Sequence, residues 1–92
     1  MPVYADAWEV EDFLQSKNVF QNALTGRPAH ADAYNTVIDY KLLAAAIDEL
    51  KALVKREQWA EMAEYWASNA YLSPNQAQLA SFVKRTVLVE VI

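Results

Sequence analysis

The sequence predicts an all-α fold, a compact bundle of about four helices that occupies residues 1–92 as a single domain. Three observations support this prediction. Hydrophobic residues make up 54% of the 92 residues, which is too much apolar material for a disordered tail. One glycine and three prolines leave little chain for extended loops. Over most of the chain, apolar residues recur at the three- and four-residue spacing of a helix.

The first helix is expected to start directly after Asp6. Asp6 and Glu9 form an Asp-x-x-Glu variant of the capping box, in which carboxylates satisfy the first backbone N–H groups. Gly26 supplies a left-handed stop, so the helix is predicted to end near Thr25. The polar residues 15–18 offer an alternative, a split into two helices. The apolar positions at helical spacing are Val10, Phe13, Leu14, Phe20 and Leu24.

A connector over residues 26–35 leads to a second helix over residues 41–56. Thr36 and Asp39 form a cap-like pair before it, and an alanine run within it has the highest intrinsic helix propensity. Its apolar stripe consists of Leu43, Ala46, Ile47, Leu50 and Val54.

The next apolar stripe falls on nearly the opposite side of a continued helix. At about 100° per residue, the two stripes cannot face one core from one straight rod. We therefore predict a break within residues 55–58 and a third helix that ends near Asn69. A continuous rod is the alternative, and it would present one face to a partner. The stripe of the third helix consists of Trp59, Met62, Ala63 and Trp66.

Residues 73–76, Ser-Pro-Asn-Gln, are the strongest helix start in the chain, because serine caps, proline suits the first position and glutamine completes a capping box. The last segment, residues 86–92, is ambiguous between helix and strand. As a strand it would pair with residues 2–4 in a short terminal β-strand pair, or with another protomer. The fourth apolar face consists of Leu79, Phe82, Val83 and Val87.

Several kinds of chemistry are excluded by composition. The chain has no cysteine, so no disulfide, thiolate nucleophile or zinc finger is expected. One glycine rules out phosphate-binding glycine loops. The single histidine, His30, lies two residues before Asp32, but no nucleophile elbow accompanies the pair. We therefore expect no catalytic residue, no bound metal and no cofactor, and predict that the protein is not an enzyme.

The charge and hydropathy of the sequence limit the kinds of partner and the cellular location that we expect. The net charge of -4 argues against direct nucleic-acid binding, which depends on lysine and arginine at phosphates. No uninterrupted apolar stretch approaches the length of a membrane span, and the first residues lack the pattern of a secretory signal. The expectation is an acidic cytoplasmic protein that does not enter a membrane.

The aromatic residues suggest a protein interface. Phe13, Phe82, Trp59 and Trp66 are expected in the core, because they lie on the apolar stripes. The residues off the stripes are candidates for partner binding, because exposed tryptophan and tyrosine are enriched at interface hot spots. These candidates are Trp8, Tyr34, Tyr40, Tyr65 and Tyr71.

The third helix also carries a row of carboxylates opposite its tryptophans, Glu57, Glu61 and Glu64. Such a row is the usual solvent-exposed face of a surface helix, and it can also bind a partner with a basic surface. A metal site does not fit, because the pattern lacks the histidines of carboxylate-bridged metal bundles.

The leading hypothesis is a non-catalytic protein–protein interaction module, a small adaptor or an inhibitor of a larger complex. That complex could be one that binds nucleic acid, and the module would then suit an accessory factor of a phage or bacterium. The alternative is a self-assembling structural protein that pairs through residues 86–92, a homo-oligomer. A small enzyme or ligand carrier with a pocket between helices is a third class.

The mass of the protein in solution distinguishes the first two hypotheses. Self-assembly predicts a mass that rises with protein concentration, because association follows mass action. The adaptor hypothesis predicts a constant monomer mass, measured by light scattering coupled to size exclusion over a wide concentration range. A defined oligomer would make self-assembly the leading function.

Overall fold

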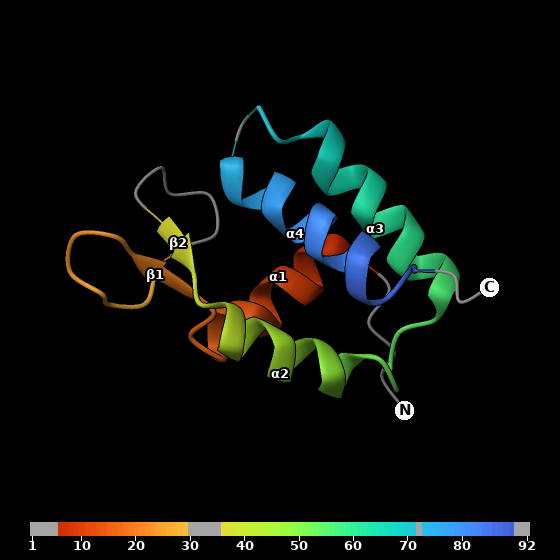
Figure 1. Cartoon of the computed structure of the whole chain (residues 1–92), viewed down its shortest axis with the longest axis horizontal. Helices are drawn as coiled ribbons and strands as arrows, with labels where there is room; N and C mark the ends of the chain where they lie inside the picture. Colours follow the sequence, from red (N-terminus) through yellow and green to blue (C-terminus); the bar gives the residue numbers. More distant parts are fainter. Residues whose placement is uncertain (1–5, 30–35, 72, 90–92) are drawn as a thin grey trace.

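The computed structural model describes residues 6–29, 36–71 and 73–89, and these form helices and one small sheet (Figure 1). The largely helical prediction is confirmed for this part of the chain. Helices α3 and α4 run side by side in opposite directions and make the most extensive helix pair. The elements are α1 (Ala7–Ser16), β1 (Phe20–Asn22), β2 (Thr36–Ile38), α2 (Tyr40–Leu50), α3 (Arg56–Ser68) and α4 (Pro74–Thr86).

Helix α1 begins where the sequence predicts, but the predicted end near Thr25 is wrong. The helix ends at Ser16, and Asn18 adopts a left-handed conformation with φ 61°, which asparagine tolerates better than most residues. The backbone N–H of Val19 closes the turn on the carbonyl of Leu14. The alternative split at residues 15–18 has the right position, although a strand rather than a second helix follows it.

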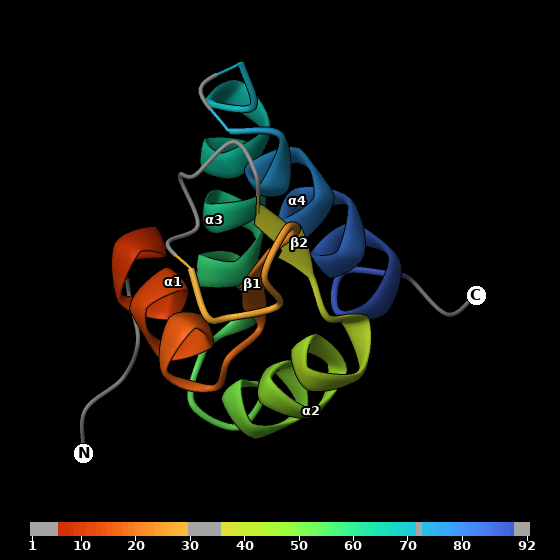
Figure 2. The same cartoon turned by 90° about the vertical axis from the view of Figure 1, so that its left-hand side faces the viewer.

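The sheet is antiparallel and pairs Phe20 with Ile38 and Asn22 with Thr36. The sequence predicts helix for residues 20–22 and no strand at residues 36–38, so this sheet corrects the prediction. Residues 2–4 and 90–92 lie outside the described residues, and within the described part of the segment Thr86 is still helical. Figure 2 shows the sheet between α1 and α4, above α2. Phe20 and Ile38 are buried, so the sheet contributes to the same core as the helices.

Gly26 has the predicted left-handed backbone, with φ 70°, but it lies in the loop after β1 rather than at a helix end. The backbone N–H of Gly26 donates to the carbonyl of Asn22, which closes this loop. Leu24, predicted to lie on the apolar stripe, is instead 83% exposed in the loop.

Helix α2 is capped by Asp39 alone, because Thr36 belongs to β2. The Asp39 carboxylate accepts hydrogen bonds from the backbone N–H groups of Lys41 and Leu42 at 3.1 and 3.2 Å. All the stripe residues predicted for this helix are buried. However, the helix ends at Leu50, and Val54 reaches the core from the turn that follows.

A break separates the second and third helices as predicted, but it lies at residues 51–55, slightly before the predicted position. Helix α3 begins at Arg56, and the Gln58 side chain accepts a hydrogen bond from the backbone N–H of Lys55 at 2.9 Å. The turn between α2 and α3 brings both apolar stripes into one core, since Trp59, Met62, Ala63 and Trp66 are all buried.

Helix α4 starts at Pro74 with Ser73 in the cap position, as predicted. The glutamine of the expected capping box has a different partner, because Gln76 is buried and its Nε2 donates to Glu11 Oε1 at 3.3 Å. Leu79 and Val83 are buried in the core, and Phe82 and Val87 pack against it while partly exposed.

One carboxylate connects three helices inside the protein. The Trp66 indole N–H of α3 donates to Glu11 Oε1 of α1 at 2.5 Å, and Gln76 of α4 donates to the same oxygen. Trp66 is completely buried, so its N–H has no access to water. A buried donor left unsatisfied costs about 1–3 kcal/mol, so Glu11 stabilises the packing of α1 against α3 and α4.

Replacing Glu11 with alanine should lower the free energy of unfolding by about 2 kcal/mol, because the indole and amide donors lose their acceptor. Urea denaturation followed by circular dichroism measures this. Glu11→Gln should cost less, because an amide oxygen still accepts from the indole N–H. Asp12→Ala, on the exposed side of α1, is the matched control and should change stability little. Equal stability of Glu11→Ala and the control would contradict the prediction.

Asp39→Ala should destabilise the protein by about 1 kcal/mol, because the first turn of α2 loses its side-chain acceptor. Asp39→Asn should retain most of the stability, since asparagine caps helices about as well as aspartate. Both variants can be compared by thermal and urea denaturation. An asparagine variant as unstable as the alanine variant would show that the negative charge, and not the cap, is what matters.

Candidate protein-binding site

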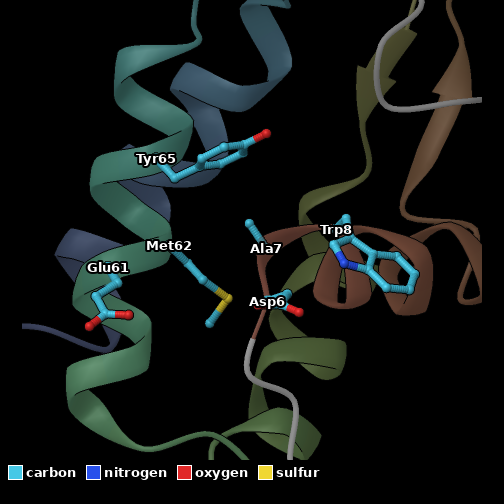
Figure 3. Close-up of a pocket in the computed structure, with 6 residues that line it drawn as sticks. All are labelled: Asp6, Ala7, Trp8, Glu61, Met62 and Tyr65. Atoms are coloured by element: carbon cyan, nitrogen blue, oxygen red, sulfur yellow. The ribbon is translucent and has the colours of Figure 1, made fainter.

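An open pocket of about 470 Å³ lies between the start of α1 and the middle of α3 (Figure 3). Two segments more than fifty residues apart in the sequence form it. Its lining residues are Asp6, Ala7 and Trp8 from the start of α1, and Glu61, Met62 and Tyr65 from α3.

The helical repeat explains how α3 contributes to the pocket. Glu61 and Tyr65 are four residues apart and therefore lie on one face of the helix, whereas Met62 turns toward the core. In Figure 3, Met62 and Tyr65 extend into the space between the helices, while Glu61 ends at the outer edge of α3. The pocket therefore has an apolar floor with an aromatic ring and a carboxylate at its rim.

Helix α1 supplies the other side of the pocket through its first residues. Asp6 holds the cap position with extended backbone, but its carboxylate makes no capping hydrogen bond. Trp8 is 66% exposed, and in Figure 3 its ring lies along α1 and points away from α3. Ala7 faces the gap between the helices, where its small side chain leaves room for a ligand.

The polar groups at the rim have no partners within the described residues. In residues 6–29, 36–71 and 73–89, no hydrogen bond or salt bridge involves the side chains of Asp6, Trp8, Glu61 or Tyr65. Tyr65 is 52% exposed, so an aromatic ring, an indole N–H, a phenol and two carboxylates are all accessible at one place. These groups are available to a ligand without breaking an internal contact.

The charges around this pocket are of one sign. Residues 6–16 hold four carboxylates and residues 57–68 hold three, together seven of the twelve in the chain, and neither segment contains lysine or arginine. The two salt bridges between described residues, Lys17–Glu49 and Asp48–Lys51, do not involve the pocket. An approaching cation is therefore attracted, and an anion repelled, at the surface formed by residues 6–16 and 57–68.

The structure brings three of the predicted partner-binding residues, Trp8, Glu61 and Tyr65, into this one pocket. Glu57 and Glu64 are exposed on α3 beside it but do not line it. Asp6 and Met62 were missed as site residues, because the sequence assigns them only as a helix cap and a core residue.

The other predicted aromatic residues lie elsewhere. Tyr71 is 78% exposed after the end of α3, outside the pocket. Tyr40 is partly engaged within the protein, since its hydroxyl donates to Gln78 Oε1 at 2.8 Å and its ring centroid lies 6.1 Å from that of Phe82. Tyr34 falls outside the described residues.

A second, smaller pocket of about 290 Å³ lies between the end of α2, the start of α3 and the end of α4. Its lining includes Lys51 and Arg56, and Arg56 Nη2 donates to the carbonyl of Leu88 at 3.2 Å. Trp59 also lines it, and the buried Nε1 of Trp59 has no hydrogen-bond partner. This pocket is lined by two cationic side chains, whereas the first is lined by two carboxylates.

Two further observations concern the described residues as a whole. Within them, no three acidic or histidine side chains are grouped so that they could hold a metal ion. None of their helices is both long and apolar enough to cross a membrane. His30 and Asp32 lie outside the described residues.

Comparison of the chain with protein-family models, with curated proteins and with solved structures gives no significant match. The function is therefore argued from the chemistry of the pocket and not from the fold, because one fold can host many functions.

Proposed function

We propose that the protein is a non-catalytic protein–protein interaction module, a small adaptor or inhibitor that binds a partner with a basic surface through the pocket between α1 and α3. The observation that carries this proposal is the convergence of Trp8, Glu61 and Tyr65, from two distant segments, at one acidic pocket. Exposed tryptophan and tyrosine beside a concave surface are typical of the anchors of protein interfaces.

The energetics favour a protein partner. Burying a large apolar side chain contributes about 1.5–3 kcal/mol, so covering Trp8 and Tyr65 would supply a substantial part of a binding free energy. The surrounding carboxylates would add attraction that speeds association and selects basic partners over acidic ones.

The nature of the partner follows from the charge of the surface. Complexes that bind nucleic acid present basic surfaces, and an acidic face of this kind can occupy such a surface in competition with phosphates. We therefore extend the proposal to a larger nucleic-acid-binding complex as the target, in the cytoplasm. Direct binding of nucleic acid is not proposed, because the seven carboxylates of residues 6–16 and 57–68 would repel it.

Self-assembly through residues 86–92 has less support. Val87 and Leu88 pack partly against the core of the same chain, so they are not free to pair with another protomer. Among the described residues of this segment after Leu88, only Val89 remains, and it is exposed.

Site-specific photo-crosslinking in cells that produce the protein tests the proposed function. A photoreactive phenylalanine in place of Tyr65 or Trp8 should give covalent adducts with one defined protein, identified by mass spectrometry. The matched control is the same substitution at Tyr71, which is more exposed than Tyr65 but lies outside the pocket. Equal adducts at all three positions, or none at positions 8 and 65, would overturn the proposal.

A further inference from the structure

We infer that the pocket between α1 and α3 receives the guanidinium group of an arginine side chain from the partner. This inference rests on the proposed function and specifies the chemistry of the group that is bound. Three features of the described residues support it: the sign of the charge, the apolar floor and the absence of a competing cation within the two segments.

The charge of the site selects a cation. Asp6 and Glu61 stand on opposite sides of the pocket and come from different helices. Because neither carboxylate has a partner among the described residues, each can turn toward a ligand without losing an internal contact. The start of α1 would by itself favour an anion, but Asp6 and Glu9 already place negative charge at that end.

The apolar floor of the pocket and the ring of Tyr65 favour a planar cation on a long alkyl chain. Ala7 and the buried Met62 line the pocket, so its floor is apolar and the alkyl stem of a long side chain can lie over it. Tyr65 extends across the space between the helices, so its ring offers a face to a planar group (Figure 3). Guanidinium is planar and weakly hydrated, and it stacks on aromatic faces.

Lysine fits this pocket less well. Its ammonium is strongly hydrated and gains most in enclosed aromatic cages, whereas this pocket is open to solvent. A guanidinium can stack on Tyr65 and donate hydrogen bonds to a carboxylate at the same time, because its donors lie in the plane of the group.

No cation from the two segments that form the pocket competes for it, because residues 6–16 and 57–68 contain neither lysine nor arginine. A cation–π contact does occur elsewhere, with Lys17 Nζ at 5.3 Å from the ring centroid of Phe13, at the opposite end of α1. The protein thus pairs a cation with one end of α1 and leaves the carboxylates and aromatic rings at its other end for a ligand.

Nuclear magnetic resonance titration of the whole protein with a short capped peptide, acetyl-Gly-Arg-Gly-amide, tests the inference. The indole N–H signal of Trp8 is the reporter, with the buried Trp59 and Trp66 as internal references. We expect the arginine peptide to shift the Trp8 signal and the backbone signals of residues 61–65, with a dissociation constant on the order of 1 mM for one exposed side chain. The citrulline peptide, neutral and of the same shape, should bind at least about tenfold more weakly, and the lysine peptide severalfold more weakly.

Two pairs of variants assign the effect to the pocket. Glu61→Gln should weaken arginine binding about threefold to tenfold, whereas Asp48→Asn, the same change of charge on α2, should leave it unchanged. Tyr65→Leu should weaken binding by a similar factor, and Tyr71→Leu should not. All four side chains are exposed, so the melting temperatures should stay close to that of the natural sequence and show that each variant is folded.

Several results would overturn the inference. Equal binding of the citrulline peptide would show an apolar groove. Equal binding of the lysine peptide would show selection of charge alone. No shift of either the Trp8 signal or the signals of residues 61–65 would show that the pocket does not bind arginine. Crosslinks at Tyr65 together with failure of the arginine peptide would reject this inference and leave the proposed function standing. Failure of both experiments would reject both.

Discussion

The carboxylate of Glu11 is the contact on which the arrangement of the helices depends. It accepts the indole N–H of Trp66 and the amide of Gln76, so α1, α3 and α4 share one acceptor inside the protein. Because a buried donor without a partner is costly, this carboxylate stabilises the close packing of the three helices. Trp66 is the neighbour of Tyr65, and Glu11 lies little more than one turn after Asp6. The contact that holds the core therefore also fixes the two sides of the candidate pocket.

The pocket exists because neighbouring residues on α3 have opposite environments. Trp66 is buried and Tyr65 is exposed, and Met62 is buried and Glu61 exposed. The inner residues hold α3 against α1 and α4, and the outer residues are left without internal partners. A rigid inner layer under an unpaired outer layer suits recognition, since the outer groups are positioned before a partner arrives and little ordering is required on binding.

Local signals were sufficient for the elements whose contacts are mostly within one helix or between sequence neighbours. The apolar stripes predict α2, α3 and α4, and the opposite faces of the two stripes predict the break before Arg56. The sheet could not be predicted in this way, because its strands have three residues each and pair across the loop from Asn22 to Thr36. Phe20 lies seven residues after Phe13, a helical spacing that arises by coincidence, and it is buried as a strand residue. Leu24 has the same spacing, but no neighbouring element covers it.

The candidate site, like the fold, has features that local sequence predicts and features that depend on contacts between distant segments. Trp8, Tyr65 and Tyr71 do not lie on the apolar stripes, and this correctly predicts that they are exposed. The prediction works because the helical repeat decides which residues of a helix face the solvent. Which exposed residues line one pocket is decided by packing between segments far apart in sequence, and that packing places Trp8 and Tyr65 at the same pocket and Tyr71 outside it. The clustering of exposed residues therefore identifies candidate binding residues better than the exposure of each residue alone. An isolated exposed tyrosine contributes little free energy to recognition, whereas the Tyr65 ring and two carboxylates without partners among the described residues lie around one apolar floor and can act on the same ligand together.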